Sequence, residues 1–304
     1  MSTAGQASPI RPILWAFAAN LGIAIAKFAA ALTTGSSAMM AETIHSCADT
    51  GNQLLLLLGL RQARRPPDAE HPLGYGKDIY FWSFIVALLL FSMGGMFSIY
   101  EGLHKLDSSE PLTKPWVALL VLGVSIVLEA LSMRGCLAEV KHVREGRSLW
   151  QWLNQSRNSE LVVVFGEDFA ALVGLVIAFG FVVLASVTGD LRFDAYGSLV
   201  IGVLLVVVAI FIATRVKQLL IGRSADPSVV ARIEAEISAD PSVLRVYRVI
   251  TIQIGSEIML AAKVHLREGL SIDAACAEIN RLERRLKERV PELRWSFIEP
   301  DIED

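Results

Sequence analysis

Two groups of ionisable side chains lie inside long apolar stretches of the sequence, where they could bind a metal ion or protons. His45 and Asp49 are four residues apart, and this spacing places both side chains on one face of a helix. Glu167 and Asp168 are adjacent in a second apolar stretch, and neighbouring helical residues point about 100° apart. Imidazole nitrogens and carboxylate oxygens are ligands that divalent transition metals accept. The four residues therefore predict an ion site at membrane depth, with Asp168 as the firmer ligand of the adjacent pair.

A purely structural role is the alternative for each of these polar residues. A lone histidine in a membrane helix can simply hydrogen-bond a neighbouring helix. Several carboxylates argue against this, because burying each one costs roughly 2.5–3.5 kcal/mol on insertion scales. A bound dication or protonation would offset that cost, and a site that exchanges one for the other is a transporter's site. Asn52 and Gln53 could donate carbonyl oxygens, although membrane amides more often link helices, and Lys27 and Glu129 favour an interhelical pair over proton coupling.

The composition is that of a membrane protein that crosses the bilayer several times. Hydrophobic residues make up 53% of the 304 residues, and the mean hydropathy is +0.49. The net charge of -3 is too small to indicate nucleic-acid binding. Cys47, Cys136 and Cys276 show no CxxC spacing and predict neither a disulfide framework nor a thiolate zinc site. The absence of an HExxH motif argues against an intramembrane metalloenzyme, so we expect no enzyme activity.

Six apolar stretches approach or exceed the ~20 residues that a helix needs to cross the hydrocarbon. They are residues 12–32, 39–60, 79–103, 116–137, 161–187 and 195–213. Gly94, Ser98 and Gly102 recur every four residues in the third stretch, a spacing that lets membrane helices approach closely. The sequence thus predicts an all-α bundle of six transmembrane helices over residues 1–222.

Basic residues between these stretches predict the orientation. One side carries Arg11, Arg61, Arg64, Arg65, Lys77, Lys141, Arg144, Arg147, Arg157, Arg215, Lys217 and Arg223, and the other carries Lys105, Lys114 and Arg192. The positive-inside rule places both termini in the cytoplasm. The polar opening segment predicts no cleaved signal or transit peptide, so we expect a bacterial inner membrane rather than an organelle membrane.

Residues 223–304 have the composition of a soluble α+β domain. The patterns predict helices over 227–238 and 272–289 and strands over 243–254, 257–266 and 294–298, with Gly255 at a turn. The order αββαβ indicates a small sheet covered by two helices. Since a domain of roughly 80 residues has a limited core, we expect it to dimerise.

A second polar motif, residues 70–77, lies in a loop of the basic side. Its proline and glycines favour a fixed turn. His71 and the nearby Asp68 could ligate a metal, and a purely structural turn is an equal alternative.

These motifs together resemble the cation diffusion facilitator family of divalent-metal transporters over nearly the whole chain. The segments that carry the resemblance are AETIHSCADTGNQ at 41–53, HPLGYGK at 71–77 and DAYGS at 194–198. EDFAAL at 167–172 and GKDIYFW at 76–82 resemble most the branch related to zinc transporter nine. The resemblance implies six transmembrane helices, a cytoplasmic metallochaperone-like domain, a homodimer, and metal export in exchange for protons.

The resemblance also implies a ligand set, from which this chain departs. The family site uses two residues four apart on the second helix, matched by His45 and Asp49, and two four apart on the fifth. Asp168 matches the last position, but Val164 stands where the other ligand is expected. Glu167 is the natural substitute.

Two further departures concern the cytoplasmic side. Tyr75 and Phe297 occupy positions that are histidine in many relatives, while His265 remains as a possible ligand in the preceding strand. We therefore expect the cytoplasmic binuclear zinc site to be degraded or absent, and dimerisation to rest on packing.

The predicted function is a Zn²⁺/H⁺ antiporter that moves metal out of the cytoplasm by alternating access. Zn²⁺ is the transported substrate, and no catalytic cofactor is expected. Because three carboxylates make a hard ligand set, Mn²⁺, Fe²⁺, Co²⁺ or Cd²⁺ is an alternative substrate. From a different class, the alternative is a membrane metal sensor or scaffold that does not transport.

Overall fold

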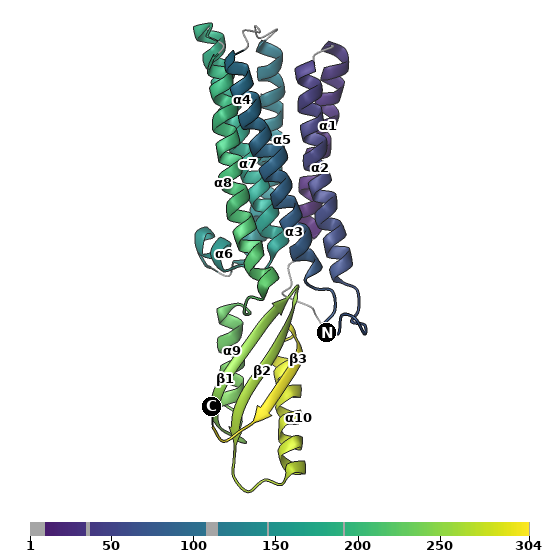
Figure 1. The fold of residues 1–304 in the computed structure, drawn as a ribbon, viewed down its shortest axis with the longest axis vertical. Helices are drawn as coiled ribbons and strands as arrows, with labels where there is room; N and C mark the ends of the chain where they lie inside the picture. The colour runs from purple at the N-terminus through teal and green to yellow at the C-terminus, as the bar shows by residue number, and fades with distance from the viewer. Residues whose placement is uncertain (1–9, 35–36, 108–114, 145, 191, 304) are drawn as a thin grey trace.

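The computed structural model describes residues 10–34, 37–107, 115–144, 146–190 and 192–303. Within these ranges the side chains of 10–12, 16, 19, 30–31, 33–34, 37–45, 48, 107 and 115 are outside the description. Long helices form one end of the molecule and a small sheet with two helices forms the other (Figure 1).

The helical end contains α1 and α2 before the loop at residues 64–77, and the helices from α3 to α8 after it. They are α1 (Ile10–Thr34), α2 (Ser37–Ala63), α3 (Asp78–Leu89), the π-helical η1 (Leu90–Met96), α4 (Phe97–Asp107), α5 (Pro115–Val143), α6 (Leu149–Gln155), α7 (Ser159–Thr188) and α8 (Arg192–Ile221). The helices α3, η1 and α4 follow one another directly. The short helix α6 was not predicted.

Four helical stretches in the described part of the chain are long and apolar enough to cross a membrane. They are Asp78–Leu106, Trp116–Val143, Ser159–Thr188 and Arg192–Ile221. A shorter apolar stretch, Ile13–Ala29, lies in α1. The chain is therefore a multi-pass membrane protein, while the number of six crossings stays a prediction.

Glycines allow η1 and α4 to contact α8 closely. A Cβ on Gly202 would lie 2.6 Å from Ile99 Cγ1 and 2.8 Å from the Ile99 nitrogen, and one on Gly102 would lie 2.8 Å from Leu199 Cγ. Gly94 faces Leu205. The predicted row of small residues thus packs against another helix of the same chain.

The predicted αββαβ order is confirmed in the C-terminal part. It contains α9 (Pro227–Ser238), β1 (Val243–Ile254), β2 (Glu257–Leu266), α10 (Ile272–Arg289) and β3 (Leu293–Pro300). The sheet order is β1-β2-β3, with β1 antiparallel and β3 parallel to β2. Every second residue of β2 is buried, because side chains of a strand alternate between its two faces. These residues form a core with the apolar residues of α9 and α10.

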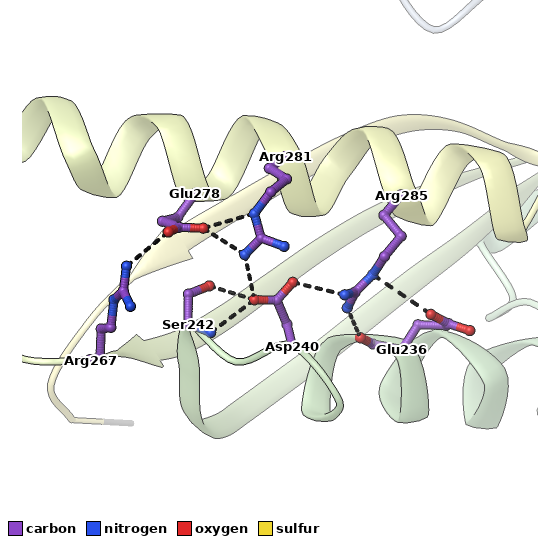
Figure 2. A network of polar contacts seen from close by, with 7 residues as sticks. All are labelled: Glu236, Asp240, Ser242, Arg267, Glu278, Arg281 and Arg285. Atoms are coloured by element: carbon purple, nitrogen blue, oxygen red, sulfur yellow. Dashed lines mark hydrogen bonds and ion pairs between the residues drawn. The ribbon is translucent and has the colours of Figure 1, made fainter.

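A polar network joins α9 to α10 (Figure 2). The Asp240 side chain, which is fully buried, contacts Arg281 Nη2 at 2.9 Å and Arg285 Nη1 at 3.1 Å. The Ser242 hydroxyl donates to Asp240 Oδ1 at 2.6 Å, and its backbone N–H does so at 2.9 Å. Arg285 also donates to the main-chain oxygen of Glu236 at 2.5 Å. One carboxylate therefore connects the end of α9 to two turns of α10.

Candidate functional site

The Glu167 carboxylate on α7 faces α2. Asn52 Nδ2 donates to Glu167 Oε1 at 3.0 Å, and Gln53 Nε2 donates to Oε2 at 2.9 Å. Both amide residues are buried. The two amides therefore link α2 to α7, the helix that carries Glu167 and Asp168, as expected for amides in membrane helices.

The neighbouring Asp168 faces α5 instead. It is 2% exposed, and Ser132 Oγ donates to its Oδ2 at 3.0 Å. Glu129, one turn before Ser132 on α5, is also 2% exposed and interacts electrostatically with Asp168. The divergence of the two carboxylates follows from the 100° step between successive helical residues.

Asp49 and Lys27 complete a cluster of charged groups at this depth. Asp49 on α2 interacts electrostatically with both Glu167 and Glu129. Lys27 on α1 is 5% exposed and interacts favourably with Glu129, as the predicted interhelical pair requires. Side chains from α1, α2, α5 and α7 therefore bring four carboxyl groups and one ammonium together.

Two predicted positions of this site remain, His45 and Val164. His45 lies in α2 one turn before Asp49, and its side chain is outside the described part. Val164 is fully buried and brings no ligand atom. Among the described side chains, no group of three or more His, Cys, Asp or Glu is arranged to hold a metal ion. The assignment of His45, Asp49, Glu167 and Asp168 as ligands thus stays a prediction.

Sequence reasoning missed Ser132 and the place of Glu129 beside Asp168. The available signal was their spacing of three residues inside the apolar α5, which puts both on one face. Ser132 is buried, and so is Ser125 on the same helix.

The second predicted site, in the loop after α2, is organised around Asp68. Asp68 Oδ1 accepts backbone N–H bonds from Glu70 at 3.0 Å and His71 at 2.8 Å, and Oδ2 accepts the Tyr75 hydroxyl at 2.6 Å. The bond from Tyr75, followed by that from the His71 backbone, lowers the pKa of Asp68. The His71 ring lies 4.3 Å from the Tyr75 ring, between centroids. These contacts favour the structural alternative, and metal binding by Asp68 and His71 stays a prediction.

The third predicted position, His265, lies on β2. Its ring stacks on Tyr247 of β1 with centroids 6.2 Å apart. Phe297 on β3 is exposed. A role of His265 in metal binding stays a prediction.

The loop after α2 also touches the C-terminal sheet. A Cβ on Gly76 would lie 2.6 Å from the Ile254 oxygen, so only a glycine allows this backbone contact. The Tyr80 hydroxyl donates to the Gly255 oxygen at 3.2 Å. The turn between β1 and β2 is thereby held against the end of α3.

Comparison with known proteins identifies the family to which this chain belongs. The cation efflux transmembrane domain matches residues 13–221. The chain is 33% identical over 313 residues to the proton-coupled zinc antiporter SLC30A9, mitochondrial, of Xenopus laevis, which covers 90% of this chain and 56% of the relative. It is 36% identical over 225 residues to metal tolerance protein C4 of Arabidopsis thaliana, covering 73% of this chain and 49% of the relative.

A more distant similarity extends to bacterial proteins. The magnetosome protein MamM of Paramagnetospirillum magneticum is 31% identical over 123 residues, which is 39% of each chain. The present chain spans about half the length of the frog and plant relatives.

Proposed function

Since the chain belongs to the cation diffusion facilitator family of metal cation efflux transporters, we propose that it exports Zn²⁺ from the cytoplasm in exchange for protons. The transport site comprises His45, Asp49 and Asp168, with Glu167 in place of the ligand missing at Val164. The frog relative is named a proton-coupled zinc antiporter, which supports the choice of metal and of coupling ion.

The observation that carries the proposal is the charge of the buried cluster. Asp49, Glu129, Glu167 and Asp168 bring four carboxyl groups together, whereas Lys27 brings one positive charge. At membrane depth such an excess is unfavourable unless protons or a cation compensate it. A cluster that can be compensated in either way supports exchange of metal for protons.

The hydrogen bonds suggest how the ligands are oriented. Ser132 donates to one oxygen of Asp168, and the amides of Asn52 and Gln53 hold the Glu167 carboxylate toward α2, where Asp49 lies. Asp168 can then use its other oxygen for metal. These neutral donors position the carboxylates without cancelling their charge.

Alternating access would couple the two ions at this cluster. Metal ligands must be deprotonated, so metal loads from the cytoplasm onto neutral His45 and the carboxylates, and protons displace it on the other side. Each pH unit across the membrane is worth about 1.4 kcal/mol per proton exchanged. The pKa of histidine lies near physiological pH, which suits it to this exchange.

The setting proposed for this transport is a homodimer in a bacterial inner membrane. Both termini lie in the cytoplasm, and residues 1–222 form the transport domain while 223–304 form a cytoplasmic dimerisation domain. The excess of Lys and Arg in one set of loops supports the orientation.

The test is metal flux into proteoliposomes with an imposed pH gradient. We expect Zn²⁺ flux that follows the gradient in the wild type and is abolished in Asp49→Asn and Asp168→Asn. Glu101→Gln on α4 is the matched control, because Glu101 pairs with Lys105 at 3.9 Å and lies outside the cluster. Loss of flux in Glu167→Gln would support Glu167 as the replacement ligand.

Three outcomes would contradict parts of the proposal. Flux that is unaffected by collapse of the gradient would exclude proton coupling. Transport of Mn²⁺, Fe²⁺, Co²⁺ or Cd²⁺ but not Zn²⁺ would change the substrate. Metal binding without flux of any of these ions would favour the sensor or scaffold.

A further inference from the structure

Three arginines meet where α8 leaves the membrane bundle. Arg215 donates from Nη2 to the side-chain oxygen of Asn154, and Arg223 donates to the main-chain oxygen of the same residue at 2.9 Å. Arg157 donates from Nη1 to the main-chain oxygen of Gln155. The end of α6 thereby gathers guanidinium groups from three different places in the sequence.

A second set of bonds ties this cluster to the segment after α8. Arg157 Nε donates to the Ser224 oxygen and its Nη2 donates to the Ala225 oxygen, both at 2.8 Å. Because Ser224 directly follows Arg223, this places Arg157 beside Arg223. The three guanidinium groups are thus fixed by backbone oxygens and one amide.

Positive charge is in excess at the cluster, because Asp226 is the one carboxylate recorded as attracting Arg157 and Arg223 within the described part of the chain, and it is shared with Arg147. Every hydrogen-bond acceptor recorded for the three arginines is a neutral oxygen. The neighbouring carboxylate, Asp226, is paired with Arg147 at 2.6 Å. Arg215 Nε is buried with no hydrogen-bond acceptor among the described residues, a cost that an added anion could relieve.

The titration behaviour agrees with this excess of positive charge. Burial, followed by repulsion from Arg223, lowers the pKa of Arg157 to about 10. Burial and then repulsion from Arg215 also lower the pKa of Arg223. Attraction by Asp226 favours the charged forms of both arginines but does not outweigh burial and the repulsion between guanidinium groups.

Exposed aromatic side chains place the cluster at the level of lipid head groups. Trp150 on α6 is 66% exposed and stacks on Phe211 of α8 with ring centroids 5.9 Å apart. The Arg215 guanidinium lies 5.1 Å from the same Phe211 ring. Figure 1 shows α6 extending sideways at the end of the bundle where α8 leads toward α9. Tryptophan is enriched at membrane interfaces, and a laterally placed helix with an exposed Trp suits that depth.

We propose that Arg157, Arg215 and Arg223 form a binding site for the phosphate group of an anionic phospholipid. The guanidinium fork matches phosphate oxygens, and basic pockets beside membrane helices on the cytoplasmic side recognise lipid head groups. Leu149 and Trp150, both exposed on α6, contact the apolar part of the lipid.

The positive-inside rule alone does not account for this arrangement. Arg61 and Arg64 follow that rule as exposed side chains at the end of α2. The three arginines of the cluster are partly buried, two of them held by main-chain oxygens and Arg215 by the Asn154 side chain, so less side-chain entropy is lost when they bind an anion.

The test measures lipid binding by the full chain in neutral detergent. Thermal unfolding is followed during titration with phosphatidylglycerol, phosphatidylcholine or inorganic phosphate, and native mass spectrometry counts retained lipids. The variant is Arg215→Gln, because Arg157 anchors two segments and its loss could prevent folding. Arg61→Gln, which removes the same charge from an exposed position, is the matched control.

We expect phosphatidylglycerol to stabilise the wild type and Arg215→Gln to weaken its binding at least tenfold. Loss of a surface charge without a site weakens binding by about fivefold at most, which is the limit expected for Arg61→Gln. Equal stabilisation by phosphatidylcholine, or equal losses in both variants, would overturn the proposal. An equal shift with inorganic phosphate would replace the lipid with a soluble anion.

Discussion

Replacement of Asp240 should loosen the C-terminal sheet and its helices without affecting the membrane helices. The Asp240 carboxylate is fully buried between α9 and α10 (Figure 2). Its Oδ1 accepts hydrogen bonds from Arg281 Nη2 and from the hydroxyl and backbone N–H of Ser242, and its Oδ2 forms an ion pair with Arg285. In Asp240→Ala, Arg281 and Ser242 lose one acceptor and Arg285 loses its ion-pair partner, while Arg281 keeps Glu278 and Arg285 keeps Glu236. Among the described residues, the polar links left between α10 and α9 are then those of Arg285 to Glu236.

The size of the effect follows from the exposure of the donors. A hydrogen bond to a charged group contributes about 1.5–3 kcal/mol. The Arg281 side chain is 43% exposed, so water replaces part of what is lost and about 1.5 kcal/mol applies to its bond. The ion pair of Arg285, which is 28% exposed, contributes up to about 1 kcal/mol. With about 1 kcal/mol from the bonds of buried Ser242, the sum is about 3–4 kcal/mol. This corresponds to roughly two to three powers of ten in the local opening equilibrium.

The effect should depend on pH in a defined direction. Burial by itself raises the pKa of Asp240, but hydrogen bonds from Ser242 and Arg281 outweigh it, and the pKa is lowered. A carboxyl with a depressed folded pKa stabilises the fold above its unfolded pKa of about 3.9, and this contribution is lost as the pH falls through the folded value. The difference between wild type and Asp240→Asn should therefore be full at neutral pH and shrink below about pH 4.

Hydrogen exchange of the full chain in detergent, read by mass spectrometry, measures this locally. Amides of α9, β1 and α10 should exchange faster in Asp240→Ala, while those of α7 and α8 keep their rates. Glu234→Gln, at an exposed position of α9, should change stability by less than about 0.5 kcal/mol. Equal exchange in wild type and Asp240→Ala would refute the reasoning, as would an effect that persists undiminished in acid.

Three other substitutions test contacts between segments. Gly76→Ala puts a Cβ against the Ile254 oxygen and should release the β1–β2 turn, seen as faster exchange at 253–257 without change in α10. Gly202→Ala should clash with Ile99 and lower the unfolding temperature in detergent, at a cost of about 1–3 kcal/mol. Asp226→Ala removes the N-cap of α9 and should destabilise that helix by at least about 1 kcal/mol; helix protection equal to wild type would contradict the cap.

The C-terminal elements were predictable because their ends are encoded locally. The bounds of α9, β1, β2 and α10 are those expected from the sequence. Asp226 and Ser271 cap the two helices, Pro227 begins α9, and Gly255 has the positive φ of 60° that the hairpin turn needs. Only β3 is longer than expected, since its pairing with β2 is set by partners distant in sequence.

In the membrane part, the sequence indicated long helices but not their irregularities. The helix α6 was missed because its seven residues lie between two long apolar stretches. A signal was present, since Ser148 and Gln151 form a capping box in which each side chain bonds the other's backbone. The π-helical turn η1 around Gly94 and Gly95 had no counterpart in the periodicity, because it depends on contact with α8.

The direction of each site carboxylate depends on contacts between helices and was therefore only partly predictable. The divergence of Glu167 and Asp168 follows from helix geometry. That α2 receives the first and α5 the second depends on how three helices pack, which residue types alone do not determine.

Glu167 lies three residues after Val164, the position where the family resemblance implies a ligand. Three residues correspond to about 60° around α7 and about 4.5 Å along it, a displacement that the longer glutamate side chain partly covers. In the structure its two oxygens bond Asn52 and Gln53, one turn beyond Asp49 on α2. Glu167 thus couples α7 to α2 in addition to adding negative charge near Asp49. If α2 and α7 move together during access changes, these two amides contribute to transport without binding metal, and Asn52→Ala should slow flux while leaving metal affinity nearly unchanged.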